Sequence, residues 1–231
     1  MPKYGTYAPP ALRAQLCLPA CIDDRSIRMT TWRKKGITLS DKQASRSGRR
    51  LFYGLGGRKD YKRAFPYLLQ AANAGYVHSQ NLVGYCYSEG LGVKKDPCRA
   101  LFWFEAAADS NHKEALFNLA LAYENGEGTT VNLRRAFDYY KRAAKLGDAD
   151  AQCNLGVAYF EGLGTKRDFK KGLSWMRRAA QKGDPKAQFN LGMAYVDGKG
   201  VAKNFRWGAF WLDRAARQGH RQAKQTLRQI R

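Results

Sequence analysis

The amino-acid sequence predicts an all-α solenoid in which pairs of helices repeat every 36 residues. Two sets of residues at equivalent positions of successive repeats, which we call columns, support this prediction. A glycine-or-asparagine column consists of Gly75, Asn111, Gly147, Gly183 and Gly219, and a tyrosine column of Tyr87, Tyr123, Tyr159 and Tyr195. A fixed period of this length is typical of repeat proteins, in which each unit buries its apolar face against its neighbours. The size of the protein is then set by the number of repeats.

Each repeat is predicted to contain a helix, a tight turn, a second helix and a Gly-x-Gly loop. Only Gly or Asn stands in the turn column, and both tolerate the left-handed conformation that ends many helices. The residue after it, Asp148 or Asp184 in two repeats, can cap the second helix, and His112 and His220 occupy the same column. A second capping column precedes the first helix of each repeat: Asp60, Asp96, Asn132, Asp168 and Asn204.

The first helix of each repeat is amphipathic. In the third repeat its predicted inward set is Ala136, Tyr139, Tyr140, Ala143 and Ala144, with the i, i+3, i+4 spacing of one helical face. Large rings are expected to fill the core opposite the paired alanines, because large and small residues alternate in well-packed interiors. This aromatic column is Tyr67, Trp103, Tyr139, Trp175 and Trp211.

The repeated pattern A-x-x-W/Y-x-x-x-A-A-x-x-G-D, followed by A-Q-x-N-L-G-x-A-Y-x-x-G-x-G, resembles the Sel-one-like repeat, a relative of the tetratricopeptide repeat. The resemblance covers roughly residues 60–231. It implies a right-handed α/α superhelix of antiparallel helix pairs that serves as a protein-interaction scaffold, and it implies no chemistry. Fold resemblance by itself says little about which partner is bound.

The predicted organisation is an N-terminal arm followed by one solenoid. Residues 1–39 contain several prolines and no periodic apolar face, so they are expected to form a basic, disordered arm. The solenoid spans 40–231, with a degenerate capping unit at 40–59, four full repeats at 60–203 and a partial repeat at 204–231. The polar final helix of the partial repeat suits a solenoid end.

Composition and cysteine usage bear on partners and compartment. The chain has 41 Lys and Arg against 19 Asp and Glu, a net charge of +22, which favours acidic or polyanionic partners. The five cysteines do not follow the repeat, which favours reduced thiols in a cytosolic protein. We therefore expect a cytoplasmic location. The alternative is an exported or organellar protein, if residues 1–28 are a processed leader. A separate alternative is that Met29 is the true start of the chain.

No constellation in the sequence indicates catalysis, a cofactor or a metal. There is no nucleophile motif, Walker loop or pair of carboxylates at a catalytic spacing. The Gly-x-Gly loops recur in every repeat, so we interpret them as structural turns rather than phosphate loops. Cys17 and Cys21 lack a nearby histidine or second cysteine pair that would complete a metal site.

The resemblance implies that the first helix of each repeat lines the concave side of the solenoid. The predicted binding surface is therefore the outer face of this helix, the face that points away from the core. The charge of this face is nearly neutral at the start of the solenoid and strongly basic toward its end. We expect it to bind an acidic segment of another protein, with two aromatic anchors among the cations. The predicted partner-binding residues are Phe102, Arg134, Lys141, Arg142, Lys145, Lys170, Arg177, Arg178, Arg206, Phe210, Arg214 and Arg217.

An alternative is RNA or DNA binding, because helical repeats of similar length can read one base per repeat. The variable columns show no consistent polar pair in each repeat that could serve as such a code, and this observation favours the protein partner. No segment of the sequence has the run of apolar residues that a transmembrane helix needs.

Overall fold

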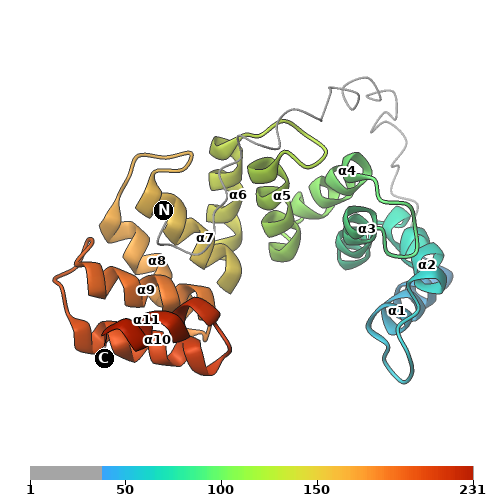
Figure 1. The fold of residues 1–231 in the computed structure, drawn as a ribbon. Helices are drawn as coiled ribbons and strands as arrows, with labels where there is room; N and C mark the ends of the chain where they lie inside the picture. The colour runs from blue at the N-terminus through green and yellow to red at the C-terminus, as the bar shows by residue number, and fades with distance from the viewer. Residues whose placement is uncertain (1–37, 231) are drawn as a thin grey trace. The chain divides into compact units, whose positions relative to one another are not determined.

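The computed structural model describes residues 38–230, which contain eleven helices and no strands (Figure 1). These residues form two compact units, 38–132 and 133–230. The first unit holds α1 (Leu39–Tyr53), α2 (Tyr61–Asn73), α3 (Val77–Glu89), α4 (Pro97–Ala108) and α5 (Lys113–Asn125). The second holds α6 (Leu133–Lys145), α7 (Ala149–Glu161), α8 (Phe169–Gln181), α9 (Pro185–Asp197), α10 (Phe205–Arg217) and α11 (Arg221–Ile230). The predicted arm lies outside the described residues except for Thr38 and Leu39, and the handedness of the solenoid stays a prediction.

The predicted helix starts agree closely with the structure. Asp96, Asp168 and Asn204 are the N-caps of α4, α8 and α10, and each side chain accepts a hydrogen bond from the third residue of its helix at 2.9–3.0 Å. Asn132 immediately precedes α6. Such caps satisfy backbone N–H groups that have no partner within the helix.

The histidines in the turn column behave differently from each other. Nδ1 of His220 accepts a hydrogen bond from the backbone N–H of Ala223 at 3.2 Å, so His220 caps α11 as predicted. His112 makes no side-chain capping bond to α5, and the prediction is wrong there. Its Nδ1 lies 3.3 Å from a carboxylate oxygen of Glu114 instead.

Each Gly-x-Gly loop returns the chain to the start of its own repeat. Gly164 has a φ of +65° and lies against the carbonyl of Leu133, the first residue of α6, where a Cβ would collide with the oxygen. The backbone N–H of Asp168 then donates to Tyr159 O at 2.7 Å. Equivalent backbone contacts join Gly92 to Tyr61 and Gly128 to Pro97, whereas a Cβ on Gly200 would collide with the side chain of Phe169. The repeated glycines are therefore required by a close backbone approach as well as by the turn.

The core differs from the prediction at the aromatic column. Trp103 is buried, but Tyr67 is 44% exposed and Trp175 and Trp211 are half-buried. The residue after each ring occupies the deepest position instead, and this buried column is Leu68, Phe104, Tyr140, Met176 and Leu212. The reason is visible at Gly156 of α7, where an added Cβ would lie 2.7 Å from Met176 Cγ. A glycine in the facing helix makes the space that Met176 fills, and this geometry turns Trp175 toward the rim.

Two further observations concern the cysteines and the possibility of a membrane-spanning helix. Cys86 and Cys153 are buried free thiols, whereas Cys98 is disulfide-bonded, so the expectation of reduced thiols is wrong at Cys98. Among residues 38–230, no helix has both the length and the apolar character needed to cross a membrane.

Candidate protein-interaction surface

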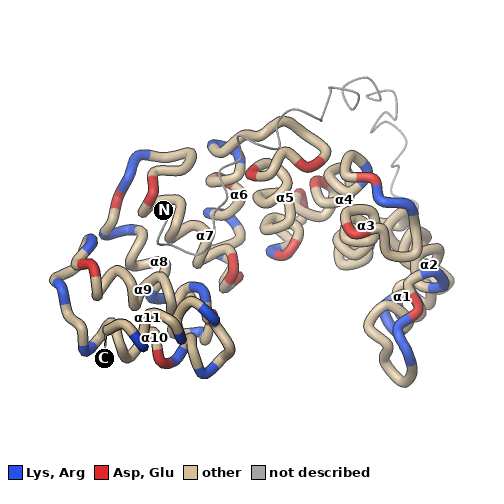
Figure 2. Tube along the Cα trace, in the orientation of Figure 1, with Lys and Arg blue, Asp and Glu red and all other residues tan. Residues whose placement is uncertain are grey.

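The cations predicted to bind a partner lie on the outer surface of three helices of the unit 133–230. We call the following set the basic face: Arg134, Lys141, Arg142 and Lys145 of α6, Lys170, Arg177 and Arg178 of α8, and Arg206, Phe210, Arg214 and Arg217 of α10. All of these residues are exposed (Figure 2 marks the Lys and Arg positions). Phe102 is half-buried in α4 and belongs to the other compact unit, so it is not included.

Hydrogen bonds between repeats hold these three helices in a row. Nζ of Lys182, the C-cap residue of α8, donates to the carbonyl of Gly147 in the turn after α6 at 2.7 Å. One repeat later, Nε2 of Gln218 donates to the carbonyl of Gly183 in the turn after α8 at 2.9 Å. The C-terminal ends of α6, α8 and α10 are therefore neighbours, and the cations near those ends share one surface.

Three arginines of the basic face stack on the half-exposed aromatic column. Arg142 lies over Tyr139 at 5.8 Å from the ring centroid, Arg178 over Trp175 at 4.6 Å and Arg214 over Trp211 at 5.8 Å. A contact of this kind contributes about 0.5–1 kcal/mol at an exposed site and restrains the planar guanidinium group near the ring. The N–H donors lie in that plane, in a fork that matches a carboxylate. The rings that were predicted to fill the core thus support the predicted binding arginines.

Other cations of the basic face already have partners within the protein. Arg134 lies 3.5 Å from Asp138, and Arg217 lies 2.7 Å from Asp213, each pair spanning one helical turn. Exposed pairs of this type contribute about 0–1 kcal/mol, so a ligand carboxylate can compete for these cations. Nη2 of Arg177 donates to the hydroxyl of Tyr195 on α9 at 3.3 Å. Arg134 and Arg217 must therefore give up an ion pair within the protein before they bind a ligand carboxylate.

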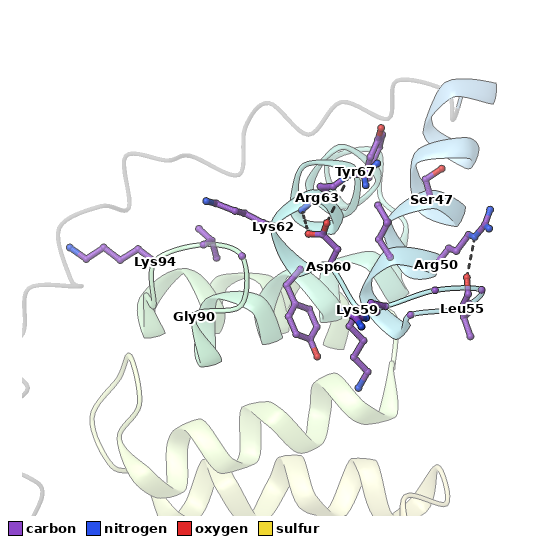
Figure 3. A pocket seen from close by; sticks show the side chains of 18 residues that line it. Ser47, Arg50, Leu55, Lys59, Asp60, Lys62, Arg63, Tyr67, Gly90 and Lys94 are labelled. Atoms are coloured by element: carbon purple, nitrogen blue, oxygen red, sulfur yellow. Dashed lines mark hydrogen bonds and ion pairs between the residues drawn. The ribbon is translucent and has the colours of Figure 1, made fainter.

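A second basic region, which the sequence analysis missed, surrounds a cavity of about 1160 Å³ in the unit 38–132 (Figure 3). It lies between the loop after α1, the first turn of α2 and the loop after α3. Its charged lining residues are Arg50, Arg58, Lys59, Asp60, Lys62, Arg63 and Lys94. A signal was present in the sequence, because basic pairs precede the cap at equivalent positions, at residues 58–59 and again at 94–95.

The cavity does not gather its cations around one point. In Figure 3 the side chains of Lys62 and Lys94 both extend to the left of the view, whereas Lys59 points downward. Asp60 accepts a hydrogen bond from the backbone N–H of Arg63 at 3.0 Å as the cap of α2. Nε of Arg50 donates to the carbonyl of Leu55 at 3.0 Å. The region is an open, basic hollow and lacks the convergent donors that hold a single small anion.

The buried thiols have the properties of core residues rather than of nucleophiles. Burial raises the pKa of Cys86 to about 12, and burial also raises the pKa of Cys153 well above its ordinary value. A reactive cysteine needs a lowered pKa and solvent access. Within residues 38–230, no group of three or more His, Cys, Asp or Glu side chains is placed to hold a metal ion.

These features define a helical-repeat solenoid with a basic outer surface, and comparison with known proteins identifies its family. The sequence matches the Sel1 repeat at residues 44–76, 77–112, 113–148, 149–184 and 185–220. Because these matches cover most of the chain, the protein belongs to the Sel1 repeat family. Sel1 repeat proteins are in general non-catalytic scaffolds for protein–protein interaction. A search of curated proteins gave no match.

Solved structures support the same assignment. A Sel1 repeat protein from Oxalobacter formigenes is similar at 33% identity and a TM-score of 0.76, over 82% of this chain and 78% of that one. The protein c5321, described as a protective antigen of uropathogenic Escherichia coli with an SLR fold, is similar at 30% identity and a TM-score of 0.74. That match covers 81% of this chain and 40% of the longer relative. An immunity protein from Pseudomonas aeruginosa, Pa5087, shares the fold at 20% identity and a TM-score of 0.54.

Proposed function

We propose that this protein is a non-enzymatic scaffold whose basic face binds an acidic segment of a partner protein. The observation that carries the proposal is the column of Arg142, Arg178 and Arg214, each stacked on an aromatic ring. Preorganised guanidinium groups lose less conformational freedom on binding than mobile lysines do. Three of them at the same position in successive repeats suit an extended chain that presents carboxylates along its length.

The charge of the whole protein supports the same conclusion. With a net charge of +22, the protein attracts acidic partners over long range and binds them faster at low salt. Gathering like charges on the basic face also costs some folding free energy, and a bound acidic segment relieves that repulsion. The scaffold activity of the Sel1 repeat family is consistent with a peptide ligand.

The test compares two charge reversals of equal size in two different places. Arg142, Arg178 and Arg214 are replaced together by Glu in one variant, and Lys59, Lys62 and Lys94 are replaced by Glu in the other. Binding of a fluorescently labelled glutamate-rich peptide is measured by anisotropy, with circular dichroism as the folding control. We expect the first variant to lose at least about tenfold in affinity, which corresponds to about 1.4 kcal/mol, and the second to lose much less.

Two outcomes would contradict the proposal. Equal losses in the two variants would mean that the peptide responds to net charge and not to the basic face. Tighter binding of single-stranded RNA than of the peptide at the same salt concentration would favour the nucleic-acid alternative, because stacked arginines and aromatic rings also bind unpaired bases.

A further inference from the structure

Two large aromatic side chains lie exposed beside each other on α10, within the basic face. Trp207 is 50% exposed and Phe210 is 43% exposed, and their ring centroids are 5.4 Å apart in an edge-to-face arrangement. Tyr195 of α9 also stacks on Trp207, with 6.4 Å between the ring centroids. We call Tyr195, Trp207 and Phe210 the aromatic platform. The contacts between the rings hold them in a fixed arrangement while leaving apolar surface accessible.

All four preceding repeats have a basic residue at the position of Trp207. These residues are Arg63, Arg99, Arg135 and Lys171. In two of these repeats the cation covers the tyrosine of the preceding helix: Arg99 lies 5.7 Å from the Tyr87 ring, and Lys171 lies 5.7 Å from the Tyr159 ring. A cation at position 207 could therefore cover Tyr195 in the same way. The fold does not require Trp here, and clustered exposed aromatic side chains are found at many binding sites.

Cations from two helices flank the aromatic platform. Arg177 of α8 donates to the hydroxyl of Tyr195 at 3.3 Å, and Arg214 of α10 lies over the Phe210 ring at 5.7 Å. An apolar side chain placed on the platform would therefore have two guanidinium groups close to it. The ligand that complements this arrangement is apolar at its centre and negatively charged at its flanks.

We infer that the aromatic platform selects acidic segments that carry an aromatic side chain. The partner's ring packs on Trp207 and Phe210, and carboxylates before and after it in the partner sequence pair with Arg177 and Arg214. This inference rests on the proposed function, which it narrows from any acidic segment to one with an aromatic residue between acids. Aromatic residues packed in this way are the side chains that most often dominate protein–protein binding energy.

The experiment uses two glutamate-rich peptides that differ at one central residue, Trp in one and Ser in the other. Binding of both is measured to the full-length protein and to Trp207→Lys, which introduces the type of residue found at this position in the other repeats. We expect the Trp peptide to bind the unaltered protein about tenfold more tightly than the Ser peptide. We expect Trp207→Lys to remove this difference while it keeps or improves binding of the Ser peptide.

Phe205→Lys is the matched control. Phe205 is 54% exposed on the same helix, but it lies outside the aromatic platform and has Lys203 over its ring at 4.8 Å. The same change of charge at this residue should leave the preference for the Trp peptide intact. Loss of the preference in Phe205→Lys to the same extent would show that added charge on α10, and not the platform, is responsible.

The outcomes separate this inference from the proposed function. Equal affinity of the unaltered protein for the two peptides would overturn this inference but not the proposed function. This comparison uses only the unaltered protein, so it does not depend on whether a variant folds. Absence of binding to either peptide would overturn the proposed function as well. If oligouridine RNA bound more tightly than both peptides and lost affinity in Trp207→Lys, the platform would be a base-stacking surface and the inference would be wrong.

Discussion

Gly164 lies on the carbonyl oxygen of Leu133, with no space for a side chain between the loop and the first turn of α6. The same approach to a backbone carbonyl recurs at Gly92 and Gly128, so in these three repeats the second glycine of the Gly-x-Gly loop closes the repeat. The turn glycines have a different role. Gly183 also has a positive φ, +97°, but no atom lies within 4 Å of where its Cβ would be.

These two glycines allow a matched comparison. Gly183→Ala should cost about 1–2 kcal/mol, because only the left-handed backbone opposes the new methyl group. Gly164→Ala should cost more, by about 1–3 kcal/mol, because the methyl group also collides with the backbone of α6. The free energy of unfolding from denaturant melts tests this order. Equal costs would show that the loop can move away from α6 without loss.

Met176 and Trp175 are neighbours in the sequence with opposite environments. Met176 is 1% exposed and packs on Gly156, whereas Trp175 is half-buried beneath Arg178. Met176→Ala should cost about 2–5 kcal/mol because it leaves a cavity. Trp175→Ala should cost less despite the larger side chain removed, and urea melts of the two variants measure the difference. A larger loss of stability for Trp175→Ala than for Met176→Ala would show that the Trp175 ring is the main core side chain at this point of α8.

The buried glutamines of α7 and α9 should respond differently to the same substitution. Nε2 of Gln188 donates to the carbonyl of Ala180 at 3.1 Å, and its Oε1 accepts from Gln218 at 2.8 Å. Gln152 donates to the carbonyl of Ala144 at 3.0 Å, but its Oε1 is buried without a partner. Gln188→Leu should cost about 1–3 kcal/mol, because the two hydrogen bonds of the Gln188 side chain are lost.

Gln152→Leu should cost less, because the substitution also removes an oxygen that has no hydrogen bond. Thermal unfolding followed by circular dichroism measures both variants under the same conditions. If Gln152→Leu proves as costly as Gln188→Leu, Oε1 of Gln152 has a partner in solution, such as a bound water molecule.

We expect a histidine pair, His78 and His112, to make the unit 38–132 sensitive to acid. His78 lies between Tyr53, whose hydroxyl is 3.3 Å from its Nε2, and His112, whose ring centroid is 5.6 Å away. Burial lowers the pKa of His78 below 6.5, Arg49 and His112 lower the pKa further, and Glu114 opposes them. The unfolded chain therefore binds a proton more readily than the folded one, so stability falls as pH drops below the unfolded pKa.

The measurement is the denaturant midpoint at about pH 7.5 and at about pH 5.5, on either side of the ordinary histidine pKa. His78→Gln cannot take up this proton, so it should lose less stability on acidification than the unaltered protein does. Burial also lowers the pKa of His112, which remains in the variant, so some acid sensitivity should persist. An identical loss in both proteins would exclude His78 as a source of the effect.

The sequence predicted the repeat, the helix pairs and most of the caps because these depend on local chemistry. A glycine that must adopt a positive φ and an Asp that caps a helix are identified by the residues around them. Local sequence does not determine whether Trp175 or Met176 is buried in the core. It depends on Gly156, which faces this point from another helix, and a helical wheel of α8 alone places both residues near the apolar side.

The predicted binding surface shows the same limit. The exposure of the basic face followed from the periodicity, and its arginine column was identified by position. The sequence analysis does not predict the stacking of Arg178 on Trp175, because it places the Trp175 ring in the core. Trp207 was not singled out, although its column is otherwise basic, because a single departure from a column becomes meaningful only when the exposed ring is seen beside Phe210.

The loop contact between Gly164 and Leu133 also has a consequence for folding kinetics. It joins residues of one repeat, and the close packing within 133–230 likewise joins helices that follow one another in the chain, from α6 and α7 to α10 and α11. Short sequence separations keep the entropy lost on each loop closure small, and proteins dominated by such contacts fold quickly. Folding can therefore begin at any helix pair and spread to its neighbours, with no distant contact that has to form first.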